Sequence, residues 1–350
     1  MAVTGISLTG QINGTGGSVD YGTDNAMFLK VFSGEVLQAF ETATVMKPLH
    51  SVRTISNGKS AQFPLTGIAS ANYHTPGEDL MTDGSYISAI KHAEKVISID
   101  DLLTATTFID KLDEAKNHYD VRSIYSSELG RALAREMDKH LIGVAINTAA
   151  EFTGNDPAAR ANAVTGLPGS TVITNDALGA NATSDIPSGG VATFIDSMFD
   201  LAAQFDEKNV PSEERYVVLT PQSYYNIVNS DDGKDLINRD FNPDPSNSFV
   251  NAQIASVAGF RMIRSNIAAQ VYGASISNPG KGDNNYGGNF SRIKAIAFQK
   301  QAFGTVKLLD LAMESEYEIR LQGHLMVAKY AMGHGSLRHE CAGVLAGADA

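Results

Sequence analysis

The sequence has a single cysteine, Cys341, and no tryptophan. One cysteine excludes an intramolecular disulfide and any zinc site built from several cysteines, and it fits a reducing compartment. No apolar run approaches the ~18 residues of a membrane-spanning helix, and the N-terminus lacks the basic and apolar regions of a secretory signal. We therefore expect a soluble protein that is made in the cytoplasm, has no membrane partner and is held by non-covalent contacts.

Basic residues are also few, because 27 Lys and Arg stand against 39 Asp and Glu and give a net charge of −12. A chain of this charge repels the phosphate backbone as a whole. Direct recognition of DNA is therefore not expected.

The motifs of common catalytic sites are missing, including GxSxG, HExxH and a GxGxxG after a strand. The segment SNGKS at 56–60 resembles the end of a phosphate-binding loop, but Arg53 stands where that loop needs a glycine. His334, His339 and Cys341 could suggest a metal site, yet each is more simply a polar residue on or near a C-terminal strand. We expect no catalytic activity, no cofactor and no metal.

What the chain does have is one long stretch of helical pattern, residues 107–150, without proline. Its apolar residues recur at helical spacing, and Thr107 followed by Asp110 is a plausible start signal. About 40 helical residues would span roughly 60 Å, so other parts of the chain must lie along this spine helix. A coiled coil is the alternative, but the apolar steps are mostly four rather than alternating three and four.

Three basic residues follow one another at four-residue spacing on this helix: Arg131, Arg135 and Lys139. In the simpler interpretation they form a solvated face with Glu128 and Asp138 as local partners. In the functional interpretation they are a docking face for an acidic neighbour.

The segments before the spine divide at residue 50. Residues 1–25 contain six glycines and only two charged residues, so we expect a flexible arm that becomes ordered on assembly, followed by a short amphipathic helix at 26–40. Residues 51–100 have strand patterns in SVRTIS, SAQFPL and SYISAIKHAEKVISID around a turn-rich middle. This β-ribbon is too poor in large apolar residues to stand alone. It either packs on its own chain or reaches onto a neighbouring subunit.

After the spine, residues 151–304 alternate helices and strands, which predicts an α/β subdomain. Its elements are a helix in VATFIDSMFDLAAQFDEKN, a strand in RYVVLTP, a helix opened by Pro221 and a strand in RIKAIAFQK, with a surface loop at 275–289. Residues 305–350 predict two or three strands without a helical partner, and we expect them to return to the spine.

Several blocks of the sequence resemble the major capsid proteins of short-tailed phages of the T-seven type. The blocks are FLKVFSGEVLQAF (28–40), SNGKSAQFP (56–64), PGEDL (76–80), IKHAEKVISIDDLLTA (90–105), NHYDVRS (117–123), GTVKLLDLA (304–312) and AKYAMGHGSLR (328–338). The resemblance implies an α+β chain with the HK97-like phage capsid fold. It divides the chain into an N-terminal arm (1–50), an extended E-loop ribbon (51–100), a peripheral domain with the spine helix (101–150), an axial domain (151–304) and C-terminal strands returning to the peripheral domain (305–350).

The same resemblance implies a structural protein that self-assembles into hexamers and pentamers of an icosahedral shell around double-stranded DNA. The expected partners are copies of the chain, a scaffolding protein during assembly, a portal protein at one vertex and packaged DNA that is contacted weakly. The expected location is the virion capsid, assembled in the cytoplasm of the bacterial host. Two alternatives are a cellular nanocompartment shell of the encapsulin type and an enzyme with its site in residues 151–300.

If the ribbon crosses a neighbour, its aromatic residues are the candidate anchors, and Glu78 and Asp79 at its tip would favour a basic partner. The residues that we expect at contacts between subunits are Arg53, Lys59, Phe63, Tyr73, Glu78, Asp79, Tyr86, Arg131, Arg135 and Lys139.

Overall fold

The structure is a computed structural model that describes residues 45–67, 69, 71–77, 79, 90, 92–112, 121–149, 170–179, 183–231, 254, 256–279 and 284–347. The chain forms two compact units. The described part of the smaller unit is 102–112, 121–137 and 309–331, and the larger unit holds the rest. The predicted arm at 1–25 and the helix at 26–40 lie outside the described residues.

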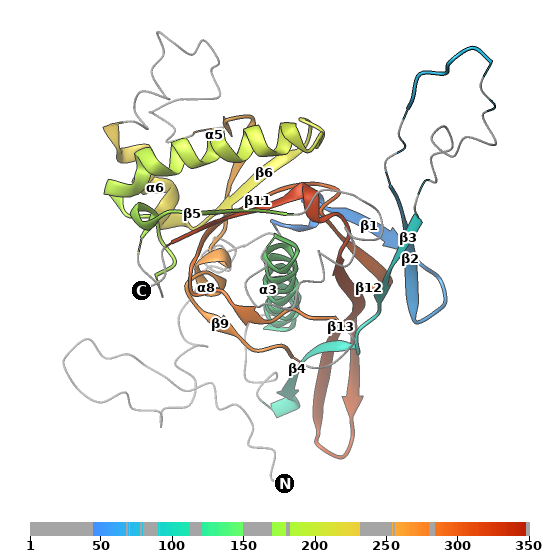
Figure 1. Cartoon of the computed structure of the whole chain (residues 1–350). Coiled ribbons are helices and arrows are strands. Elements are labelled where there is room, and N and C mark those ends of the chain that lie inside the picture. Colours follow the sequence, from blue (N-terminus) through green and yellow to red (C-terminus); the bar gives the residue numbers. More distant parts are fainter. Residues whose placement is uncertain are drawn as a thin grey trace. The chain divides into compact units, whose positions relative to one another are not determined.

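The larger unit is built on a six-stranded sheet with the order β5-β14-β11-β6-β8-β7 (Figure 1). Its strands are β5 (Thr171–Thr174), β6 (Arg215–Leu219), β7 (Ser256–Val257), β8 (Phe260–Arg264), β11 (Ile293–Gln299) and β14 (Ala342–Ala346). Every residue of β11 is buried, as expected for a central strand covered on both faces.

Helix α5 (Val191–Glu207) packs on this sheet by an apolar stripe. Phe194, Met198, Leu201 and Phe205 are fully buried, and their three- and four-residue steps place them on one helical face. Helix α6 (Pro221–Asn229) begins with proline at its first position, and the Thr220 hydroxyl caps it by accepting from the Ser223 amide at 3.2 Å. Both helices and the strands β6 and β11 confirm the sequence-based predictions.

The C-terminal strand β14 differs from its prediction. It lies between β5 and β11 in the six-stranded sheet instead of returning with the strands before it. All five of its residues are buried, as in a strand that is paired at both edges and covered on both faces.

The predicted surface loop at 275–289 is also wrong in part. Its ends form the paired strands β9 (Ser275–Ile276) and β10 (Gly288–Asn289), and Tyr286 is buried. The loop is polar in composition, but the Tyr286 side chain within it is part of the core.

Strand β1 (Ser51–Thr54) has the predicted conformation but another partner. It pairs in parallel with residues 304–307 of β12 (Phe303–Glu318), so it is not part of the ribbon. The ribbon consists of β2 (Ser60–Thr66) and β3 (His92–Ser98). A short 3-10 helix, η1 (Lys47–Leu49), precedes β1. The other short helices are the 3-10 helices η2 (Asp176–Leu178), η3 (Ser188–Gly190) and η5 (His339–Cys341) and the α-helix α8 (Ala268–Val271).

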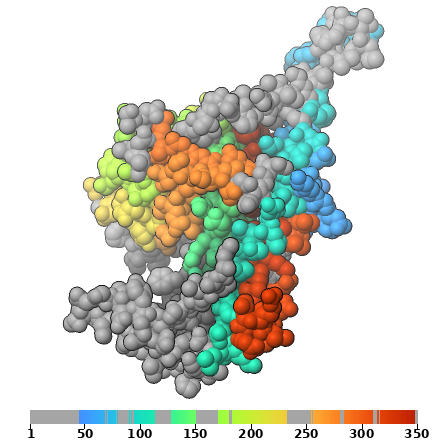
Figure 2. All heavy atoms as spheres, turned by 90° about the horizontal axis from the view of Figure 1, so that it is seen from below, coloured from blue at the N-terminus to red at the C-terminus, as the bar shows by residue number. Residues whose placement is uncertain are grey.

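In the smaller unit, β4 (Leu103–Asp110) pairs antiparallel with residues 323–330 of β13 (Gly323–Ser336), the strand that follows β12. Figure 2 shows the orange-red end of this hairpin beside β4. Helix α3 (Val121–Ala149) contributes its residues up to Met137 to this unit and its remainder to the larger one.

The predicted start of the spine helix at Thr107 is wrong. Residues 103–110 form β4, with Phe108 opposite Leu325. Three β-branched threonines, at positions 104, 106 and 107, favour this extended pairing over the weak helical start signal. The helix itself is confirmed over 121–149 and runs through Gly130 without interruption. Within the described residues, no helix is both long and apolar enough to span a bilayer.

Candidate subunit-contact surface

The ribbon is fixed at its base by its own chain. Ala61 of β2 and Ile97 of β3 are buried together with Val306 and Leu337, while the alternate positions of β2 are exposed. Period-two alternation of this kind buries one face of a strand pair and leaves the other to solvent. The base of the ribbon therefore packs on its own chain, which is the first of the two interpretations of the ribbon.

Arg53 and Phe63 act at this base. The Arg53 guanidinium donates to the Gln62 carbonyl at 2.7 Å and lies 5.7 Å from the centroid of the Phe63 ring. Phe63 packs against the small core formed by Ala61 and its neighbours. Both predicted contact residues thus stabilise the attachment of the ribbon, and their contact with another subunit stays a prediction.

The exposed apolar residues lie further along the ribbon. Tyr73 is 101% exposed and Ile90 46%, whereas Val96, 51% exposed, lies at the base opposite Gln62. Lys59 and Asp79 are also exposed, whereas Glu78 and Tyr86 lie outside the described residues. The exposed Tyr73 and Ile90 on this projecting element are therefore candidate contact residues.

The exit of the ribbon is held by a polar junction that the sequence did not indicate. Asn284 donates from Nδ2 to the Ser98 carbonyl at 2.7 Å and to the Asp100 carboxylate at 2.9 Å. The Tyr286 hydroxyl donates to the other oxygen of Asp100 and accepts from the His334 amide at 3.1 Å. Burial raises the pKa of Asp100, and the hydrogen bonds from Tyr286 and Asn284 oppose that shift. The only sequence signal was an aromatic residue within a run of Asn and Gly.

Close packing completes the junction. The His140 ring of α3 stacks on the Tyr286 ring with centroids 4.5 Å apart. A Cβ at Gly143 would lie 2.4 Å from the Tyr286 carbonyl oxygen, and one at Gly333 would lie 1.8 Å from the Ser98 carbonyl oxygen. Glycine is therefore required at both positions, because no other residue allows this approach.

A second buried chain of hydrogen bonds links residue 50 to β12 and β13. His50 Nδ1 donates to the Met46 carbonyl at 2.9 Å, its Nε2 lies 2.6 Å from the Thr305 hydroxyl, and that hydroxyl lies 2.7 Å from His334 Nδ1. Burial lowers the pKa of His50 to about 4 and that of His334 well below its usual value. Both rings are thus held neutral. A neutral imidazole has one donor and one acceptor nitrogen, so His50 can donate to Met46 and accept from Thr305, whose oxygen accepts from His334.

The three residues weighed as a metal site have separate roles. His334 belongs to the chain of hydrogen bonds just described, and His339 bonds the Thr148 carbonyl at 2.9 Å. Burial raises the pKa of the Cys341 thiol to about 12. No group of three potential ligands that could hold a metal occurs among the described residues.

The basic stripe on the spine is partly neutralised within the chain. Glu128 accepts from Arg131 at 3.4 Å and from Arg135 at 3.3 Å. Arg131 is largely covered, with 12% of its side chain exposed, while Arg135 is 42% exposed. Lys139 follows in the part of α3 that belongs to the larger unit. The prediction that Glu128 is a local partner is confirmed.

Asp138, the other predicted partner, is buried and has a different role. Its carboxylate accepts from the amides of Val45 at 2.9 Å and Met46 at 3.3 Å. Burial raises its pKa to about 6, against the lowering effect of these two bonds. Asp138 therefore attaches Val45 and Met46 to α3, and its raised pKa makes this attachment sensitive to pH.

The pKa of Asp138 predicts a pH effect on stability. The folded-state value of about 6 exceeds the ordinary value of 3.8, so the carboxyl disfavours folding above pH 6 and this cost disappears as the pH falls. Asp138→Asn removes the titration but keeps an acceptor oxygen. The unfolding free energy of the wild type should therefore rise relative to that of the variant by about 2 kcal/mol between about pH 7 and pH 4.

Urea unfolding of both proteins across this range measures the difference. The buried His50 and His334 have the opposite effect, because their lowered pKa values reduce the unfolding free energy as the pH falls below 6.5. This effect is common to the wild type and the variant, so it cancels in the difference between them. A difference that does not change with pH would contradict the assignment.

Comparison with known proteins gives a consistent result. Residues 62–346 match the family described as Gp10A-like, major capsid protein. The chain is 36% identical over 349 residues to the major capsid protein of Escherichia phage T7, with 94% of each chain covered. It is 35% identical over 337 residues to the major capsid protein of Enterobacteria phage T3, with 91% of each covered.

Solved structures agree with this comparison. The capsid structure of the cyanophage P-SCSP1u has a TM-score of 0.74 at 39% identity and covers 93% of this chain and 94% of its own. The mature capsid of bacteriophage PhiM1 has a TM-score of 0.69 at 16% identity, with 98% of each chain covered, which shows the fold alone.

Proposed function

Since this chain belongs to the Gp10A-like family of major capsid proteins, we propose that it builds hexamers and pentamers of an icosahedral shell through its ribbon and spine helix. The chain is the major capsid protein of a tailed phage, has the HK97-like fold and forms the virion capsid. It is a structural protein and not an enzyme. Its family and solved relatives favour this function over a nanocompartment shell or an enzyme site in residues 151–300.

The observation that supports the proposed role of the ribbon is the contrast along its length. The base is packed against Val306 and Leu337 of the same chain, while Tyr73 and Ile90 beyond it expose apolar surface. Figure 1 shows β2 and β3 standing out from the six-stranded sheet of the larger unit. An anchored base with exposed apolar side chains beyond it fits an arm that covers an adjacent subunit.

The further partners that we propose follow from assembly and charge. A scaffolding protein would direct closure of the shell, and a portal protein would take one vertex. Packaged double-stranded DNA would be contacted weakly, because a chain with net charge −12 neutralises few phosphates. Electron microscopy of the protein co-expressed with its scaffolding protein tests the proposal: closed particles containing pentamers and hexamers are expected, and unassembled subunits would contradict it.

The proposed division of the chain changes in two places. The E-loop becomes the ribbon of β2 and β3 without β1, because β1 pairs with β12. The axial domain gains β14 from the C-terminal segment. The other bounds, with the arm at 1–50, the peripheral domain at 101–150 and the axial domain at 151–304, remain a proposal that rests on the resemblance.

The spine stripe gives a prediction about assembly. Arg135→Glu should leave the subunit soluble and folded but reduce the yield of shells. The ion pair with Glu128 is half-exposed at both ends, and such pairs contribute at most about 1 kcal/mol to stability. Any large loss of shells would therefore reflect a lost contact between subunits. Sedimentation of co-expressed protein measures the yield.

Lys300→Glu is the matched control, because Lys300 forms a similarly exposed ion pair with Glu214 at 2.6 Å. It should assemble as the wild type does over a range of salt concentrations. If Arg135→Glu also assembles normally, the stripe is only a solvated face.

A further inference from the structure

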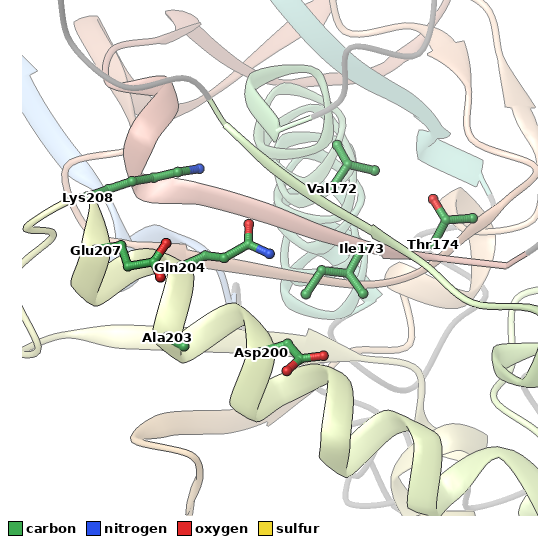
Figure 3. Close-up of a pocket in the computed structure, with 8 residues that line it drawn as sticks. All are labelled: Val172, Ile173, Thr174, Asp200, Ala203, Gln204, Glu207 and Lys208. Carbon is green, nitrogen blue, oxygen red and sulfur yellow. The ribbon is translucent and has the colours of Figure 1, made fainter.

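A groove lies between strand β5 and helix α5 in the larger unit (Figure 3). Its volume is about 650 Å³, and it is open to solvent. The residues that line it are Val172, Ile173, Thr174, Asp200, Ala203, Gln204, Glu207 and Lys208. In Figure 3 the Ile173 side chain points towards α5, while Val172 and Thr174 point to the opposite side of the strand.

Strand β5 is an edge strand, since it pairs with β14 on one side and ends the six-stranded sheet. The Asn175 amide bonds the Ala346 carbonyl at 3.0 Å, so alternate residues back along β5 direct their backbone groups towards β14. Val172 and Thr174 between them direct their N–H and C=O groups to the outer edge. Such an edge is a template for another extended chain.

The helix side of the groove carries negative charge. Asp200 and Glu207 are exposed, and a separation of seven residues places them two turns apart on one face of α5, about 10 Å along its axis. The ammonium group of Lys208 is turned to the strand, where it donates to the Ser170 carbonyl at 3.0 Å and the Thr171 hydroxyl at 2.6 Å. The groove therefore combines two carboxylates, an apolar floor of Ile173 and Ala203, and a strand edge.

We propose that this groove binds an extended segment of a partner polypeptide that carries Lys or Arg side chains and adds as a strand to the outer edge of β5. Backbone hydrogen bonds to Val172 and Thr174 supply the register, and the carboxylates of Asp200 and Glu207 select a basic segment. A basic partner is favoured over a second copy of this chain, because 39 Asp and Glu outnumber 27 Lys and Arg in the chain. This surface is separate from the ribbon and spine contacts proposed above.

Binding of synthetic peptides to the full-length protein tests the charge requirement. The probe is a fluorescent peptide of alternating Val and Thr with Lys at both ends, and the comparison peptide has Glu at these ends. We expect the Lys peptide to bind at least about tenfold more tightly and to weaken as salt increases. Asp200→Lys and Glu207→Lys should each weaken binding of the Lys peptide by about tenfold.

Asp196→Lys is the matched control, because Asp196 is exposed on the same helix but does not line the groove. It should bind the Lys peptide as the wild type does. Equal binding of both peptides, no binding of either, or an equal loss with Asp196→Lys would each overturn the proposal.

The strand-addition geometry has its own test. Val172→Pro removes the outward N–H without removing a bond to β14, and it should abolish binding while the melting temperature is retained. If the variant unfolds, a Lys peptide methylated at its backbone nitrogens makes the same test on the unchanged protein. Undiminished binding in the applicable test would overturn strand addition.

A photo-crosslinker on Thr174→Cys identifies the occupant. Labelling is selective because the natural Cys341 is buried and burial raises its thiol pKa to about 12. Crosslinks to the added Lys peptide are the expected result. Crosslinks that instead join the groove to residues 150–169 of the same chain, or to a second copy, would show that another occupant fills it and would overturn the proposal.

Discussion

Replacing residues 67–91 with a short Gly/Ser linker should give a protein that folds and melts cooperatively but forms no closed shells. Thr66 and His92 are paired partners at the end of the ribbon, so the linker closes a hairpin without disturbing the register. Ala61 and Ile97 keep their places in the small core with Val306 and Leu337. The replacement therefore removes the exposed residues Tyr73 and Ile90 and spares the folded base.

We expect a large loss of shells, because in the proposed assembly the ribbon supplies contact area on the adjacent subunit. Specific protein interfaces bury roughly 1,200–2,000 Å² in total, and we expect the extended arm to supply a large share of that area. Sedimentation and electron microscopy of the variant co-expressed with scaffolding protein should show only monomers or isolated capsomers.

A linker of 25 Gly and Ser residues is the matched control for length. It keeps the length of the ribbon but none of its side chains, so this variant should also form no closed shells. Closed shells from the short-linker variant would show that the ribbon packs only on its own chain and makes no contact that assembly requires.

Gly333→Ala should lower the stability of the larger unit by about 2–3 kcal/mol. The added Cβ would lie 1.8 Å from the Ser98 carbonyl oxygen and 2.9 Å from its carbon. Both are backbone atoms at the end of β3, so β3 must move. The movement would break the bond that Asn284 donates to the same carbonyl at 2.7 Å and loosen the exit of the ribbon.

Chemical denaturation of the purified subunit measures this loss, with Gly189→Ala as the control. A Cβ at Gly189 meets nothing within 4 Å, so the control should be nearly neutral. Equal stabilities of the two variants would mean that Ser98 and Gly333 do not approach as closely as the structure places them.

The sequence predicted elements whose partners are near in sequence or whose pattern is long. Helix α5 followed from the spacing of Phe194, Met198, Leu201 and Phe205, and α6 from Pro221. The spine helix was predicted from its length, but its start was placed within β4, since local propensity does not include pairing with β13 more than 200 residues later. Strands β1 and β14 were found as strands, whereas their partners depend on the tertiary fold.

The candidate contact surface was predictable in outline only. Glu128 was expected beside the basic stripe because helix neighbours lie three or four residues apart. The cation–π contact between Arg53 and Phe63 could not be predicted, because it depends on how β1 and β2 are placed. The junction of Asp100, Asn284 and Tyr286 was missed, because its members are 184 and 186 residues apart and lie in polar surroundings.

Crosslinking from Tyr73 in assembled shells tests most directly whether the distal ribbon lies on an adjacent subunit. Shells would be assembled from equal amounts of light and isotopically heavy Tyr73→Cys subunits that carry a photo-crosslinker. We expect crosslinked peptides that join a light to a heavy chain, because Tyr73 is fully exposed on its own subunit. Crosslinks found only within light chains and only within heavy chains would contradict this contact.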